Sequence, residues 1–68
     1  MKTNIDKVAA NVRGIRAERG LTQQALADKV KISRVYLAMI EGASREPTLT
    51  VLDRIAKALK VKVGGLLE

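Results

Sequence analysis

The sequence predicts an all-α fold, a compact domain of four or five helices around one aliphatic core. Apolar residues recur at steps of three and four, the spacing of one face of a helix, and Gly20, Gly42 and Pro47 separate the runs. The 68 residues contain no cysteine and no histidine, which excludes a disulfide and argues against a zinc site. The core must therefore come from the aliphatic residues that dominate the 47% hydrophobic content.

The first predicted helix runs from about residue 5 to residue 19. Asn4 is suited to cap its start, and Gly20 is suited to end it in a left-handed conformation. Its apolar face is predicted to consist of Ile5, Val8, Val12 and Ile15, with Arg19 at its end.

Two similar helix starts follow within a short stretch. Thr22 and Ser33 are both suited to cap a helix, and each follows an apolar residue that can pack onto a leucine one turn into the helix. These pairs are Leu21 with Leu26 and Ile32 with Leu37. Because only Lys31 and Ile32 separate the two helices, a steep helix-turn-helix crossing over 22–42 is favoured over a single kinked helix.

A fourth helix is predicted to start at Thr48, directly after Pro47. Its apolar stripe is predicted to contain Leu49, Leu52, Ile55, Ala56 and Leu59. The tail, with Val61, Val63, Leu66 and Leu67, fits either a short fifth helix or an extended dimerisation strand, and the Gly64-Gly65 pair weakens both alternatives.

The charge balance favours a polyanionic partner over a merely soluble basic surface. Thirteen Lys and Arg residues against seven Asp and Glu residues give a net charge of +6. A single tyrosine cannot form the stacking platform of single-strand and RNA binders, so duplex DNA is the favoured nucleic acid. No apolar run is long enough for a membrane span or resembles a secretory signal, and a cytoplasmic location is predicted.

The third predicted helix has an outward face without acidic residues. Leu37 and Ile40 set its inward direction, and the residues opposite are Arg34, Val35, Ala38, Met39 and Gly42. Arginine reads guanine in the major groove, and small apolar side chains contact thymine methyl groups. The face therefore favours base reading, with a protein-binding patch as the alternative.

Catalysis is not expected. The chain has no histidine or cysteine to act as base or nucleophile, and Ser33 and Ser44 have no evident activating partner. No cofactor and no metal are predicted.

The stretches LTQQALADKVKISRVYLAMIEG, residues 21–42, and REPTLTVLDRIAKALKV, residues 45–61, resemble the lambda-repressor and Cro type of helix-turn-helix regulators. That group includes phage-type repressors and restriction-modification controller proteins. The resemblance implies one DNA-binding domain over residues 1–68, with its helix-turn-helix at 22–42. It also implies a homodimer on a palindromic operator that acts as a transcriptional repressor or controller.

The resemblance further implies roles for individual residues. Base reading falls to Arg34, Val35 and Met39, with Ala38 between them on the same face. Contacts to phosphate, or to a base, fall to Thr22, Gln23, Tyr36, Ser44 and Arg45. By periodicity, Arg16 and Glu41 each lie on the flank of the inward face of their helix, and the same family joins these positions by a structural ion pair.

Two positions depart from the family pattern, because Lys31 and Ala43 stand where glycine is usual. Either the turn differs there, or the domain tolerates the strain of a left-handed conformation. Unless the sequence is part of a longer protein, self-association is expected to use the fourth helix and the tail, including Leu66 and Leu67. A protein-interaction module on the same fold, such as an antitoxin or adaptor, is the alternative function.

Overall fold

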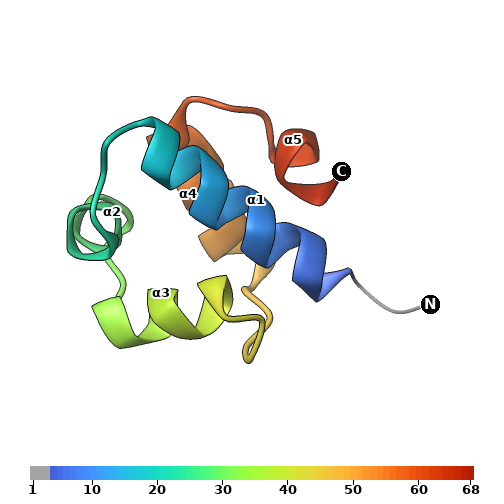
Figure 1. Cartoon of the computed structure of the whole chain (residues 1–68), viewed down its shortest axis with the longest axis horizontal. Coiled ribbons are helices and arrows are strands. Elements are labelled where there is room, and N and C mark those ends of the chain that lie inside the picture. The colour runs from blue at the N-terminus through green and yellow to red at the C-terminus, as the bar shows by residue number, and fades with distance from the viewer. Residues whose placement is uncertain (1–3) are drawn as a thin grey trace.

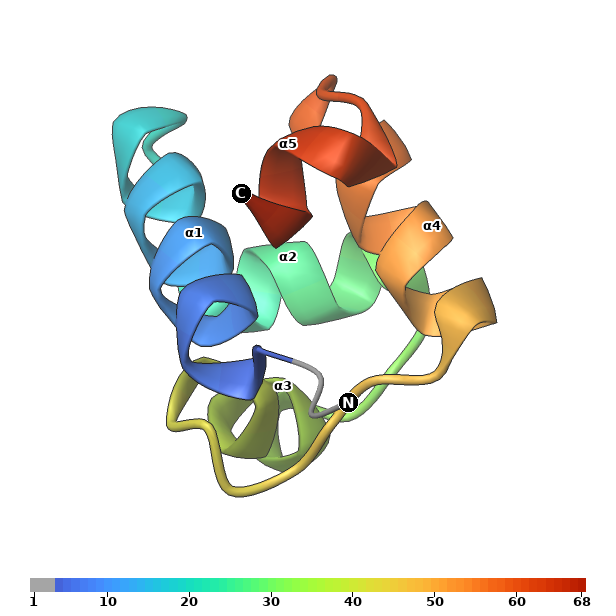
Figure 2. The ribbon, with the colours of Figure 1, turned by 90° about the vertical axis from the view of Figure 1, so that its right-hand side faces the viewer.

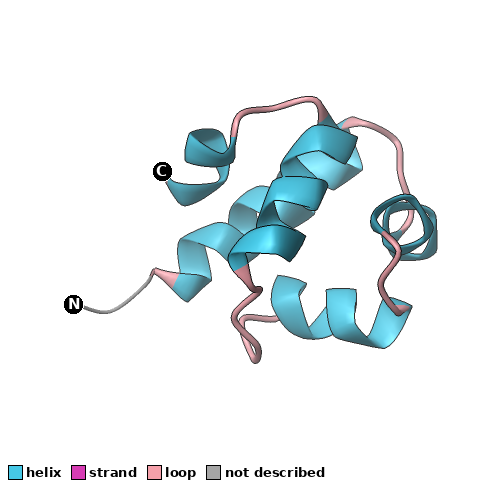
Figure 3. Ribbon diagram, turned by 180° about the vertical axis from the view of Figure 1, so that it is seen from behind, coloured by secondary structure: helices cyan, strands magenta, loops and turns pink. Residues whose placement is uncertain are grey.

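The computed structural model describes residues 4–68, and within them all regular structure is helical (Figure 3). The helices are α1 (Ile5–Glu18), α2 (Gln23–Val30), α3 (Arg34–Glu41), α4 (Leu49–Leu59) and α5 (Val63–Leu67). The all-α prediction is confirmed, and the ambiguous tail forms a short fifth helix. None of the helices in residues 4–68 has the length and apolar character needed to cross a membrane.

The predicted caps form at four helix starts. The side chains of Asn4, Thr22, Ser33 and Thr48 each accept a hydrogen bond from a backbone N–H three residues later, at 3.0 to 3.2 Å. Each bond satisfies one of the N–H groups that a helix start leaves without a partner. Short helices such as α2 and α3 therefore begin where local side-chain chemistry predicts.

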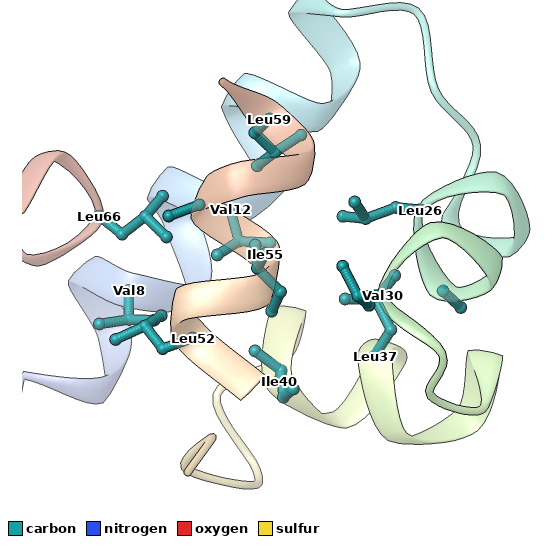
Figure 4. Close-up of a cluster of buried hydrophobic side chains, with 12 residues drawn as sticks. Val8, Val12, Leu26, Val30, Leu37, Ile40, Leu52, Ile55, Leu59 and Leu66 are labelled. Atoms are coloured by element: carbon teal, nitrogen blue, oxygen red, sulfur yellow. The ribbon is translucent and has the colours of Figure 1, made fainter. Parts of the chain in front are cut away.

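The core lies where α1, α2, α3 and α4 converge, and α5 closes it from one side (Figures 2 and 4). Its large, fully buried side chains come from all five helices: Val12, Leu26, Val30, Leu37, Ile40, Ile55, Leu59 and Leu66. α3 runs along one edge of the molecule and packs on α1 and α2 (Figure 1). One face of α3 is thereby held while the opposite face stays open.

Two residues predicted to extend helical stripes lie outside the core. α1 ends at Glu18, and the exposed Arg19 donates from Nε to the carbonyl oxygen of Leu59 at 3.2 Å. Leu49 is 76% exposed because it is the first residue of α4, at an end that the rest of the bundle does not cover (Figure 2). Both predictions were wrong, since periodicity gives the direction of a side chain but not how far the neighbouring helices extend.

The tail also corrects the expected self-association surface. Leu66 is fully buried in the core, so it is not available to a second copy, whereas Leu67 stays exposed. Asn11 of α1 donates from its amide to the carbonyl oxygens of Leu66 and Glu68, both at 3.0 Å. These bonds fasten the end of the described chain to the first helix.

Three non-glycine residues adopt the left-handed conformation. Lys31 and Lys60, which end α2 and α4, have φ of 61°, and Ala43, after α3, has φ of 60°. At Lys31 and Ala43 the domain keeps the glycine-type turn and accepts strain of about 1–2 kcal/mol per residue. Lys60 also adopts the left-handed conformation, which could not be predicted because lysine has no preference for it.

Replacing Lys60 by glycine tests this strain. We expect Lys60→Gly to raise the free energy of unfolding by up to about 1 kcal/mol, because the relieved strain exceeds the flexibility that glycine adds to the unfolded chain. Ala10→Gly, on the exposed side of α1, should instead lower it by about 1 kcal/mol. Urea denaturation measures both, and a loss of stability in Lys60→Gly would contradict the assignment of strain.

Candidate nucleic-acid interface

The turn between α2 and α3 sets the two helices at a steep crossing. In Figure 1, α2 is seen end-on while α3 lies lengthwise below it. Lys31 ends α2, and the N–H of Ile32 donates to the carbonyl oxygen of Ala27 at 3.0 Å, which reverses the chain. Ser33 then caps α3 directly, so the turn has no free length in which to relax.

α3 has an inner and an outer face, as its sequence predicts. Leu37 and Ile40 are fully buried against α1 and α2. On the outer face Arg34 is exposed, Ala38 is half-buried, and Val35 and Met39 are 54% and 40% exposed. The four predicted base-reading residues therefore share one open surface, which we call the reading face.

At the start of α3, the reading face meets the start of α2. Nη1 of Arg34 lies 3.5 Å from Oε1 of Gln23, the first residue of α2. Thr22 lies directly before Gln23, where its hydroxyl oxygen caps α2. The structure thus brings together one predicted base reader and two predicted phosphate contacts.

The remaining predicted contacts lie in the loop after α3, with Ser44 and Arg45, and in the first turn of α3, with Tyr36. The backbone N–H groups of Ser44 and Arg45 donate to the carbonyl oxygen of Met39 at 3.0 and 3.3 Å, and the Ser44 hydroxyl donates to the same oxygen at 3.2 Å. The Arg45 guanidinium lies 5.9 Å from the centre of the Tyr36 ring, within cation–π range. These contacts fasten the loop and keep a cation beside the reading face.

Behind the reading face, Arg16 of α1 and Glu41 of α3 form a bidentate ion pair. Nε of Arg16 lies 2.7 Å from Oε2 of Glu41, and Nη2 lies 3.0 Å from Oε1. Nη1 of Arg16 donates to the carbonyl oxygen of Leu21 at 2.7 Å. The pair therefore joins α1, the turn before α2, and the end of α3.

Glu41 is more buried than its position on the flank of the helical stripe suggests, with a side chain only 3% exposed. A carboxylate in such a place is costly unless ionic and hydrogen-bond partners surround it. Arg16 supplies two donors, and Gln23 adds a third from Nε2 to Oε1 of Glu41 at 3.1 Å. No buried side-chain nitrogen or oxygen within residues 4–68 lacks a hydrogen-bond partner.

Comparison with known proteins decides the family of this fold. A family model described as helix-turn-helix matches residues 12–66 of the chain. The chain belongs to this helix-turn-helix family. The match includes the reading face, the turn before it, and the helices that support it.

Named relatives of this helix-turn-helix domain are regulators. The chain is 42% identical over 59 residues to the immunity repressor protein of Bacillus phage phi105, covering 87% of the chain and 41% of that protein. The chain thus spans less than half the length of this relative. The fold is similar to the restriction-modification controller protein C.AhdI from Aeromonas hydrophila, with a TM-score of 0.89, 26% identity, and coverage of 96% and 98% of the two chains.

A further solved structure is that of SinR, a master regulator for biofilm formation, in complex with DNA. It matches with a TM-score of 0.85 and 27% identity, covering 90% of this chain and 98% of that one. The resemblance to phage repressors and controller proteins is confirmed by these relatives.

Two contacts of the helix-turn-helix domain were missed by sequence reasoning. Arg13 donates from Nη1 to the backbone carbonyl oxygen of Glu41 at 2.6 Å, which adds a second tie between α1 and the end of α3. Arg13 lies three residues before Arg16, so the two side chains share one face of α1, and this spacing could have indicated that both reach the end of α3. Nothing in the sequence indicates the hydrogen bond from Gln23 to Glu41, because it depends on how close the start of α2 lies to the end of α3.

Removing the cation tests the ion pair. We expect Arg16→Ala to lower the free energy of unfolding by about 3 kcal/mol, because the Glu41 carboxylate stays buried without its main partner. The matched control is Arg19→Ala, which removes an exposed guanidinium that has one backbone bond. Thermal and urea denaturation measure the difference, and equal losses in the two variants would contradict a special role for the pair.

Proposed function

We propose that this domain binds duplex DNA sequence-specifically by placing α3 in the major groove, and that it regulates transcription. The observation that carries the proposal is the reading face, an open, acid-free surface on a helix whose opposite side is locked in the core. A helix fits the major groove, where arginine distinguishes guanine and apolar groups meet thymine methyls. SinR, which has a similar fold, was solved in complex with DNA, and this supports DNA binding by the present domain.

The proposed contacts fall into two classes. Arg34 reads a guanine, while Val35, Ala38 and Met39 provide apolar contacts to neighbouring bases. Phosphate contacts come from Thr22 and Gln23 at the start of α2, from Tyr36 in the first turn of α3, and from Ser44 and Arg45 in the loop after α3. Tyr36 could contact a base instead of a phosphate. The phosphate contacts fix the register of the helix on the duplex.

Two copies of the domain are proposed to bind a palindromic operator, with half-sites about 10 bp apart. Since Leu66 is buried, the exposed apolar residues left on α4 and α5 for self-association are Leu49 and Leu67. The regulator is proposed to act in the cytoplasm as a repressor or controller. A catalytic activity is not proposed, because the relatives described above are named as regulators.

The alternative is a module that binds a protein through the same surface. The exposed side chains of Val35 and Met39 are the observation in its favour, because exposed apolar residues also mark protein interfaces. The net charge of +6 favours DNA over such a partner.

The salt dependence of binding separates the two functions. We expect affinity for duplex DNA to fall steeply as salt rises, with a log–log slope of several units, because bound phosphates release counterions. Fluorescence anisotropy over a range of salt concentrations measures the slope. No DNA binding at low salt, or a flat slope, would favour the protein partner.

Two arginine variants separate base reading from phosphate contact. On a site selected from a random duplex library, Arg34→Ala should relax the preference at one base pair by about 1–3 kcal/mol. Arg45→Ala should weaken all duplexes alike and reduce the salt slope by about one unit. The assignment of Arg34 fails if its loss weakens every duplex equally.

A further inference from the structure

Gln23 lies between a buried carboxylate and the exposed arginine of the reading face. Its Nε2 donates to Oε1 of Glu41 at 3.1 Å, and its Oε1 accepts from Nη1 of Arg34 at 3.5 Å. Its neighbour Gln24 faces elsewhere and donates to Asp28 within the same helix at 2.9 Å. Of these two adjacent glutamines, only Gln23 joins the interior to the reading face.

The chemistry of the carboxylate decides which way the Gln23 amide points. The Glu41 carboxylate, bonded to the Arg16 guanidinium, only accepts hydrogen bonds. The amide must therefore turn its NH₂ group toward Glu41, and its carbonyl oxygen consequently faces Arg34. The Arg34 guanidinium only donates hydrogen bonds and favours the same orientation, and Glu41 adds to that preference from the interior.

Arg34, which donates to Gln23, has more N–H donors than base reading requires. A guanidinium has five N–H groups in a rigid plane, and bidentate reading of guanine uses two of them. A bond from Nη1 to Gln23 leaves the remaining donors free for a base. It also limits the swing of a long, exposed side chain that otherwise reaches neighbouring bases and phosphates.

We propose that Glu41 is a positioning residue for Arg34, acting through Gln23. The base preference at the Arg34 position is then set partly by a buried carboxylate that does not contact DNA. This inference rests on the proposed DNA-binding function. It adds to that function a determinant of specificity on the inner side of α3, held by Arg16 from α1.

The first experiment uses the two adjacent glutamines as a matched pair. Gln23→Leu keeps the approximate size of the side chain and removes the amide, and Gln24→Leu does the same one residue later. Affinities are measured for two duplexes that differ only at the base pair whose preference is lost in Arg34→Ala. We expect Gln23→Leu to reduce the ratio of the two affinities roughly ten-fold, and Gln24→Leu to leave it unchanged.

A double-mutant cycle tests whether the effect passes through Arg34. In the Arg34→Ala background, Gln23→Leu should cause no further loss of discrimination, because the side chain that it positions is gone. If Gln23→Leu weakens both duplexes equally and leaves the ratio unchanged, Gln23 serves only as a phosphate contact and the proposal is overturned.

The second experiment changes the carboxylate itself. Glu41→Gln offers Gln23 both a donor and an acceptor, so residue 41 no longer holds the amide in one orientation, and we expect the affinity ratio to fall. Arg13→Ala is the control, because it loosens the tie between α1 and α3 through the backbone of Glu41 and spares the carboxylate. A folded Glu41→Gln protein that keeps the wild-type ratio overturns the role of Glu41.

A measurement without DNA keeps the proposal testable if Glu41→Gln does not fold. In the NMR spectrum of the wild-type protein, the Gln23 side-chain amide should exchange its hydrogens more slowly than a free glutamine, because it is bonded to a buried group. Exchange as fast as in free glutamine overturns the proposal. A wild-type protein that binds all duplexes equally overturns the proposed function itself.

Discussion

The ion pair between Arg16 and Glu41 is the interaction on which the arrangement of the helices depends. α3 is only eight residues long, and helices of that length have little stability on their own. Arg16 joins the end of α3 to α1 and, through the carbonyl oxygen of Leu21, to the turn before α2. One guanidinium thus holds the end of α3 against α1 and against the turn that follows α1, and the aliphatic core packs beneath them.

Features that depend on neighbouring residues were predictable from the sequence. The caps at Thr22, Ser33 and Thr48, and the division of α3 into a buried and an open face, follow from side-chain chemistry and helical spacing. The left-handed turn at Lys31 was suspected from the resemblance, because family members have glycine there. Local rules thus located the candidate site without any knowledge of packing.

Features that depend on how far the helices extend were not predictable in this way. Leu49 has the periodicity of a core residue, but it lies beyond the end of the packed region, whereas Leu66 follows two glycines and is fully buried. Likewise, periodicity placed Glu41 on a flank, and only the crossing of α1 over the end of α3 buries it. The bond from Gln23 to Glu41 arises from that same crossing.

The sharing of one carboxylate among several side chains has a consequence for how this sequence can diverge. Substitution of Glu41 removes the partner of Arg16 and of Gln23 at once, so these three positions are expected to change together or not at all. Val35 and Met39 have exposed side chains and belong to no such group. These two positions on the outer surface of α3 are therefore free to acquire new residues one at a time, while the residues that support the helix are expected to change as a group.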